Sequence, residues 1–79
     1  MNKKIVKIYT TPACGYCHMA KNFFRENNIE YAEFDVSGDA AKRDEMIKIS
    51  GQMGVPVIDI DGELVIGFDK NKISQLLGI

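Results

Sequence analysis

The sequence lacks an excess of charge of either sign, and it lacks any long hydrophobic run. Ten lysine and arginine residues are scattered among eleven aspartates and glutamates, so we expect neither nucleic acid nor an anionic membrane as a partner. No apolar stretch approaches the ~20 residues that span a bilayer. Lys7 interrupts the apolar segment that a signal peptide would need. We therefore expect a cytoplasmic protein.

Cysteine and histidine are scarce as well, which restricts the possible metal sites. The chain has two cysteines, Cys14 and Cys17, and one histidine, His18. A structural zinc site needs four ligands, and the sequence contains no second Cys/His pair to complete one. Cys-x-x-Cys-His is also the attachment signature of c-type haem, but that interpretation requires export of the chain. We expect no bound metal, and the alternatives for the cysteines are small core residues or redox chemistry.

The length of the chain predicts a single domain over residues 1–79, with no room for a second core. So short a chain buries only ~60% of the surface that its unfolded form exposes, which leaves a thin stability margin. A hydrophobic fraction of 46% with regular apolar patterning still predicts a folded globule.

Alternation and helical spacing predict the elements in the first half of the chain. Residues 4–10 alternate and carry apolar side chains on both faces, which predicts a central strand. A helix is predicted after the cysteines and should end near Asn27-Asn28. The apolar face of this helix is predicted to contain Met19, Ala20, Phe23 and Phe24. Residues 30–36 alternate again and predict a second strand.

The second half is predicted to form a helix, a hairpin and a final helix. Ser37 or Asp39 can cap a helix that runs to about Ser50 and ends at Gly51. Its apolar face is predicted to contain Ala40, Met46, Ile47 and Ile49. Asp61-Gly62 is a hairpin signal between strands at residues 55–60 and 64–66, and Asp69 can cap a last helix that ends at Gly78. The β-α-β-α-β-β-α order predicts an α/β fold with a mixed four-stranded sheet flanked by three helices.

The cysteine pair lies where the first predicted strand is followed by the first predicted helix. At the helix start, Cys14 would meet unpaired N–H groups and the positive end of the dipole, which favour a thiolate. Cys17, one turn later, would be shielded and less acidic. An exposed thiolate can attack a disulfide, and a second thiol can then resolve the mixed disulfide. The spacing therefore predicts a redox-active dithiol.

Over nearly its whole length, the chain resembles the glutaredoxins. The resemblance rests on Ile8-Tyr9-Thr10, on Cys14-Gly15-Tyr16-Cys17-His18, on residues 40–48, on Gly54-Val55-Pro56-Val57 and on Gly67-Phe68-Asp69. It implies the thioredoxin-like fold in a monomer. It also implies reduction of protein disulfides or glutathione mixed disulfides, with glutathione as co-substrate and no tightly bound cofactor. Cys14 would be the nucleophile and Cys17 the resolving thiol.

The resemblance also implies a binding surface around the cysteines. Pro56 is expected to be cis and to face them, and Val55 is expected to offer its backbone to a bound peptide. Tyr16 is expected beside the cysteinyl group of glutathione, and Asp69 at its γ-glutamyl end. The remaining positions of the expected site are Thr11, Gly67 and Phe68, with Phe68 as an apolar contact for a substrate peptide.

Three positions depart from the usual pattern of the family. Gly15 replaces a proline, which makes the turn more flexible and raises the cost of ordering it by roughly 0.5–1 kcal/mol. Thr11 stands where many members carry a lysine that helps to hold a glutathione carboxylate. Ile66-Gly67-Phe68 replaces a pair of glycines and resembles redoxins that serve ribonucleotide reductase and are reduced by thioredoxin reductase. The electron donor is therefore open, and a dimer that binds an iron–sulfur cluster through Cys14 and glutathione is a further alternative.

Overall fold

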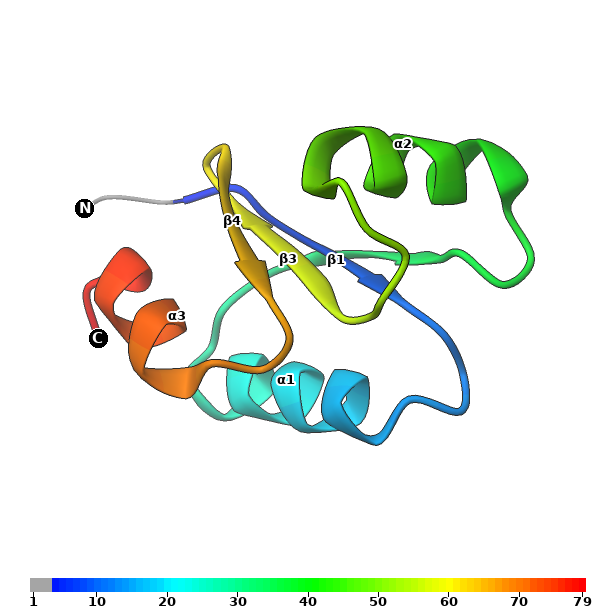
Figure 1. The fold of residues 1–79 in the computed structure, drawn as a ribbon. Coiled ribbons are helices and arrows are strands. Elements are labelled where there is room, and N and C mark those ends of the chain that lie inside the picture. The colour runs from blue at the N-terminus through cyan, green and yellow to red at the C-terminus, as the bar shows by residue number, and fades with distance from the viewer. Residues whose placement is uncertain (1–3) are drawn as a thin grey trace.

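The computed structural model describes residues 4–79, and its elements follow the predicted order (Figure 1). The strands are β1 (Val6–Thr10), β2 (Ala32–Asp35), β3 (Val57–Ile60) and β4 (Glu63–Ile66). The helices are α1 (Gly15–Glu26), α2 (Ala40–Ser50) and α3 (Lys70–Leu77). The four-stranded sheet has the order β2-β1-β3-β4, in which β1 and β2 are parallel and the other pairs antiparallel. The predicted mixed sheet with three helices is confirmed.

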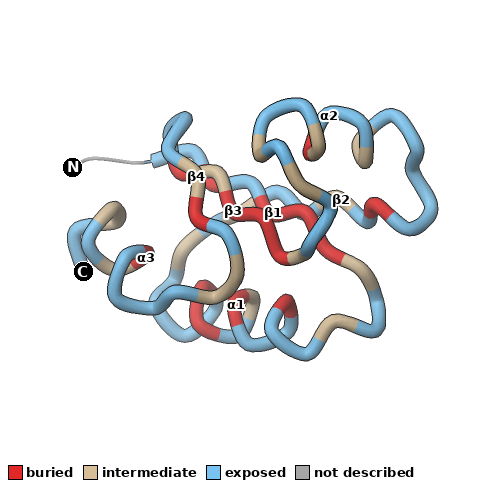
Figure 2. Tube along the Cα trace, viewed as in Figure 1, coloured by how far each residue is buried: buried red, intermediate tan, exposed pale blue. Residues whose placement is uncertain are grey.

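Strand β1 is central, as predicted, and it is buried on both faces. Helices α1 and α3 cover one face of the sheet and α2 covers the other (Figure 1). Ile8 packs in the cluster that contains α1 and α3 residues, whereas Tyr9 packs in the cluster that contains Met46 of α2. Figure 2 shows the buried positions concentrated along the central strands and the helix faces turned toward them. Within residues 4–79, no helix is both long and apolar enough to cross a membrane.

The buried side chain of Tyr9 connects this centre to α2. Its hydroxyl donates to Glu45 Oε2 at 3.1 Å. Burial and the neighbouring carboxylate together raise the pKa of Tyr9 to about 12. Tyr9 is therefore a neutral hydrogen-bond donor near neutral pH, and its role is to hold α2 against the sheet.

Several strand boundaries are narrower than predicted. The strand predicted at residues 30–36 extends only over Ala32–Asp35, the positions in register with β1, and the N–H of Val36 still donates to the carbonyl of Thr10 at 2.9 Å. The strand predicted at residues 55–60 begins at Val57, since the preceding Pro56 has no N–H to contribute to a ladder. The two residues left outside β3 are Val55 and Pro56.

The predicted apolar face of α2 is wrong at Ala40 and Ile49, both of which are exposed. The side of the helix that faces the sheet follows the spacing of Lys42, Met46 and Ser50, four residues apart. Lys42 occupies one of these positions because its stem extends across Phe34, with Nζ 4.3 Å from the ring centroid. Ile49 therefore lies on the flank of α2 and reaches solvent.

Truncating Met46 and Ile49 separately should distinguish the two positions. Met46→Ala should lower the free energy of unfolding by about 2–5 kcal/mol, because Met46 is 1% exposed. Ile49→Ala should stay within about 1 kcal/mol of the wild-type value, because Ile49 is 41% exposed. Urea denaturation measures both. Equal losses in the two variants would contradict this orientation of α2.

Candidate active site

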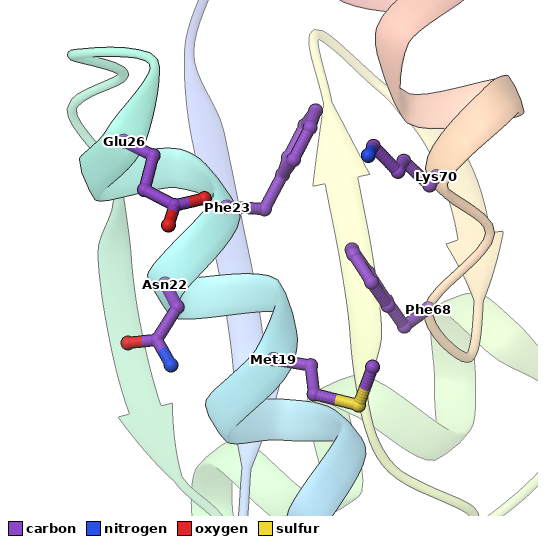
Figure 3. Close-up of a pocket in the computed structure, with 6 residues that line it drawn as sticks. All are labelled: Met19, Asn22, Phe23, Glu26, Phe68 and Lys70. Atoms are coloured by element: carbon purple, nitrogen blue, oxygen red, sulfur yellow. The ribbon is translucent and has the colours of Figure 1, made fainter.

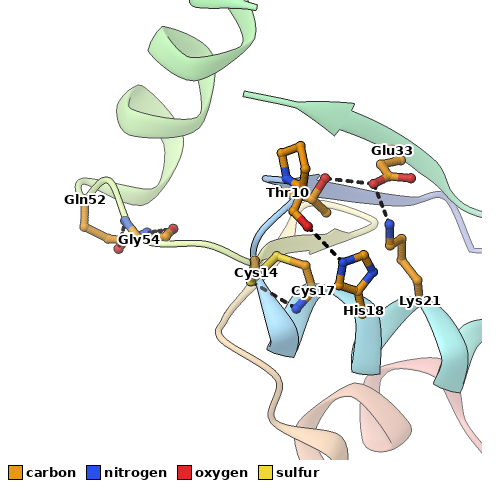
Figure 4. Close-up of a disulfide and its surroundings, with 9 residues drawn as sticks. Thr10, Cys14, Cys17, His18, Lys21, Glu33, Gln52 and Gly54 are labelled. Atoms are coloured by element: carbon orange, nitrogen blue, oxygen red, sulfur yellow. Dashed lines mark hydrogen bonds and ion pairs between the residues drawn. A yellow bond between two sulfur atoms is a disulfide. The ribbon is translucent and has the colours of Figure 1, made fainter. Parts of the chain in front are cut away.

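Cys14 is the N-cap of α1, and Cys17 lies in its first turn. The backbone of Cys14 is extended, with φ −84° and ψ 110°, and its Sγ accepts a hydrogen bond from the N–H of Cys17 at 3.1 Å. The two sulfurs are joined in a disulfide, with the Cα atoms 5.2 Å apart (Figure 4). The predicted position of the pair at a helix start is confirmed, and the structure shows its oxidised state.

The two cysteines differ in accessibility as predicted. Cys17 is 0% exposed and belongs to the buried face of α1, whereas Cys14 is half-buried. A reagent or substrate therefore reaches the pair at Cys14. In the reduced state, the N–H of Cys17 and the positive end of the helix would favour a negative charge on Cys14 Sγ.

The Val55–Pro56 peptide lies across from the residues that lead into the cysteines. Tyr9 pairs with Val57 in the antiparallel β1–β3 register, so continuing that register places Pro56 opposite Thr10 and Val55 opposite Thr11. The Val55–Pro56 bond is cis, as the resemblance implied. Within residues 4–79, the N–H and C=O of Val55 have no hydrogen-bond partner. A backbone edge is thus open beside the cysteine loop.

The segment after β4 reaches the same end of the sheet. Gly67 adopts φ +81°, and its N–H donates to the carbonyl of Pro56 at 2.8 Å. Asp69 is the N-cap of α3 and accepts from the N–H of Lys72 at 3.1 Å. The site therefore lies where β1 and β4 end and β3 begins. The residues that meet there are Thr11, Cys14, Val55, Pro56 and Gly67. Tyr16, 64% exposed, projects from the first turn of α1.

A polar network that the sequence analysis missed lies behind the cysteines. Thr10, which is 2% exposed, donates to Glu33 Oε2 at 2.8 Å. The Nζ of Lys21 donates to the same oxygen at 2.8 Å (Figure 4). The hydrogen bond from Lys21 is the main cause that lowers the pKa of Glu33. This network fastens α1 to β1 and β2, and the spacing of Lys21 four residues after Cys17 is the sequence signal for it.

His18 follows the cysteine pair and is an exposed polar residue. Its Nε2 lies 3.0 Å from the carbonyl oxygen of Pro12, which can only accept, so Nε2 is the donor in this contact. The ring thereby ties the first turn of α1 to the loop that precedes Cys14.

A groove runs between α1 and the start of α3. It has a volume of about 320 Å³ and is lined by Met19, Asn22, Phe23, Glu26, Phe68 and Lys70. Figure 3 shows Met19 extending from α1 toward Phe68, whose ring points toward Phe23. The predicted apolar face of α1 is wrong at Met19, which is 49% exposed, because Cys17, Ala20 and Phe24 occupy the buried side of α1. Phe68 is half-buried and packs edge-to-face on Phe23, with centroids 6.0 Å apart.

The chain is similar to known proteins in both sequence and fold. The family model described as Glutaredoxin matches residues 6–65. Glutaredoxin 3 of Escherichia coli strain K12 is 45% identical over 64 residues, which cover 81% of this chain and 77% of that protein. A crystal structure of a mutant of the thioredoxin-like protein BC3987 has a TM-score of 0.89 at 40% identity, with 100% of this chain and 99% of that chain covered. A buckwheat glutaredoxin–glutathione complex shares the fold, with a TM-score of 0.74 at 22% identity over 98% of this chain and 73% of that chain.

Replacing Glu33 with glutamine should produce a stability loss that depends on pH. Because its folded-state pKa lies below 4.5, the carboxylate stabilises the fold above that pH, and the contribution disappears as the pH falls through the folded pKa. With the Glu33 side chain 37% exposed, we expect a loss of at most about 1 kcal/mol at neutral pH. Urea denaturation of the oxidised protein at neutral pH and near pH 3 measures it. Glu63→Gln, at an exposed carboxylate of β4, is the control. A Glu33→Gln loss of the same size at both pH values would contradict the assignment.

Proposed function

This chain belongs to the glutaredoxin family and is a thiol-disulfide oxidoreductase, and we propose that it reduces protein disulfides and glutathione mixed disulfides through Cys14 and Cys17. The observation that carries the proposal is the unequal placement of the two thiols. Cys14 is reachable and accepts an N–H bond at the helix start, whereas Cys17 is enclosed within bonding range of it. Cys14 is the nucleophile and Cys17 the resolving thiol.

The reaction proceeds in two exchanges. The thiolate of Cys14 attacks one sulfur of the substrate disulfide, so a mixed disulfide forms and the other substrate sulfur leaves as a thiolate that takes up a proton. Cys17, after losing its proton, attacks Cys14 Sγ and releases the second substrate sulfur. Two electrons have then passed to the substrate, and the product is the Cys14–Cys17 disulfide seen in the structure.

The open backbone of Val55 is the proposed binding edge for the substrate. An extended peptide, or the cysteinyl unit of glutathione, can exchange backbone hydrogen bonds with the free N–H and C=O of Val55 as an added strand would. The exposed Tyr16 flanks that unit, whereas Pro56, the neighbour of Val55 in the chain, is buried. The buckwheat glutaredoxin crystallised with glutathione supports this ligand for the shared fold.

Residues around the start of α3 are proposed to hold the γ-glutamyl end of glutathione. The first N–H groups of α3 have no helical acceptor and favour the ligand carboxylate. The carboxylate of Asp69 at the N-cap suits the ligand ammonium group. Gly67 and Phe68 join this corner to Pro56, and Phe68 also adds an apolar contact for substrate peptides. Thr11 faces the glycyl end without the positive charge of a lysine.

Serine substitutions test the division of labour between the thiols. Cys14→Ser should abolish all turnover, because no nucleophile remains. Cys17→Ser should keep glutathione-dependent deglutathionylation and lose most reduction of protein disulfides, since free glutathione can resolve the mixed disulfide only in the first reaction. Turnover of a glutathionylated peptide and of a protein disulfide measures the two activities. The assignment is wrong if Cys17→Ser loses both activities to the same extent.

The electron donor can be tested at Thr11. The oxidised protein is offered either glutathione with glutathione reductase or thioredoxin reductase, and NADPH consumption is followed. We expect both systems to work, and we expect Thr11→Lys to raise the glutathione-dependent rate about fivefold by adding a cation for the glycyl carboxylate. Thr11→Gln is the uncharged control. An equal change in both systems, or no change in either, would remove Thr11 from the glutathione site.

A further inference from the structure

Gln52 encloses the backbone of Gly54 between the two ends of its side-chain amide. Its Oε1 accepts from the N–H of Gly54 at 2.6 Å, and its Nε2 donates to the carbonyl of Gly54 at 3.1 Å (Figure 4). The backbone N–H and C=O of Gly54 are thus both satisfied by the side chain of Gln52. The orientation of the Gly54 backbone is therefore set by Gln52, which sequence analysis had not identified.

The two hydrogen bonds between the Gln52 side chain and the Gly54 backbone form a bracket around Gly54. This bracket is anchored to the end of α2. Ser50 Oγ lies 2.5 Å from the carbonyl of Met46 and 3.0 Å from the carbonyl of Gln52, and it accepts from the N–H of Gln52 at 3.4 Å. Gly51 ends the helix in the left-handed conformation, with φ +72°. Because Met46 is buried against the sheet, the hydrogen bonds of Ser50 connect Gln52 to the protein core.

Gln52 and Gly54 depend on each other sterically. A Cβ built on Gly54 would lie 2.7 Å from Oε1 of Gln52, which is closer than real Cβ contacts come. A side chain at residue 54 would therefore displace the amide. The bracket requires glycine at that position, although the space around Gly54 is otherwise open.

The residue next to this bracket is Val55, whose backbone N–H and C=O have no partner within residues 4–79. On the other side of Val55, the carbonyl of Pro56 is held by the N–H of Gly67 at 2.8 Å. The Gly54 carbonyl that Gln52 holds belongs to the same peptide unit as the Val55 N–H, and the Pro56 carbonyl held by Gly67 follows the peptide unit that carries the Val55 carbonyl.

We infer that Gln52 is a positioning residue that holds the Val55 backbone ready to pair with the substrate, through its hydrogen bonds to Gly54. This inference rests on the proposed role of Val55 in binding. The Gln52 side chain makes its hydrogen bonds within its own loop. It therefore contributes by lowering the entropy cost of ordering that loop when the substrate binds. Because the edge consists of backbone groups, this preorganisation favours all substrates that present an extended cysteine-containing segment.

The test compares Gln52→Ala with the wild-type protein in the turnover of a glutathionylated peptide. We expect KM to rise about 5- to 10-fold, as two hydrogen bonds that order the loop are lost. The rate at which iodoacetamide alkylates reduced Cys14 should not change, since Gln52 does not contact the thiol. Gln52→Glu keeps the acceptor for the Gly54 N–H and loses the donor to its carbonyl, so its KM should be intermediate. Gln75→Ala, at an exposed glutamine of α3, is the matched control.

A double-mutant cycle with Gly54→Ala separates this role from a general loss of structure. Gly54→Ala alone should raise KM, because its Cβ displaces the amide of Gln52. Added to Gln52→Ala, it should have little further effect, so the two changes should be strongly non-additive. Additive effects would overturn the inference, as would a slower alkylation of Cys14 that parallels the KM change.

The outcome for the wild-type protein distinguishes a failure of the role of Gln52 from a failure of the proposed function. If the wild-type protein turns over the peptide and Gln52→Ala has the same KM, the role of Gln52 is refuted and the proposed function stands. If the wild-type protein turns over no disulfide substrate, the proposed function fails, and the role of Gln52 in it fails as well.

Discussion

The hydrogen bond from the N–H of Cys17 to Cys14 Sγ is the interaction on which the active site depends. It forms because Cys14 is an N-cap, so its side chain turns over N–H groups that have no helical partner. The same geometry brings the two Cα atoms to 5.2 Å, within the range of a disulfide, whereas a strand would separate them by about 10 Å. A helix start therefore allows one sulfur to be stabilised as an anion and also to close a ring with the other.

The sheet supplies the surroundings that this pair needs. Because β3 is antiparallel to both β1 and β4, the start of β3 meets the ends of the other two strands. The cysteine loop, the Val55–Pro56 peptide and the Gly67 turn thus converge from segments far apart in the chain. Hydrogen bonds among Thr10, Glu33 and Lys21 then hold α1 to β1 and β2. They keep the start of α1 in place beside the Val55–Pro56 backbone.

The order of the elements and the position of the cysteines could be predicted from the sequence, because periodicity, caps and turn residues are local signals. Helix orientation was less predictable at Met19 and Ile49, since an apolar residue beside the buried stripe fits the pattern equally well and packing selects between them. The contact of Thr10 with Glu33 joins residues 23 apart and depends on strand register. The bracket formed by Gln52 is local, but it depends on a side-chain conformation that no pattern specifies.

The two parts of the proposed site, the thiolate position at Cys14 and the binding edge at Val55, are both built from backbone groups. The electrostatic part, at Cys14, is built from backbone groups of α1 and is independent of any substrate. The proposed binding edge at Val55 is also backbone, and its neighbours Gly54 and Pro56 are held by hydrogen bonds that a ligand does not have to supply. Since neither part reads side chains, discrimination between substrates has to come from the surrounding surface. The groove between Met19 and Phe68 offers apolar area on that surface, and glutathione has no large apolar side chain to place in it.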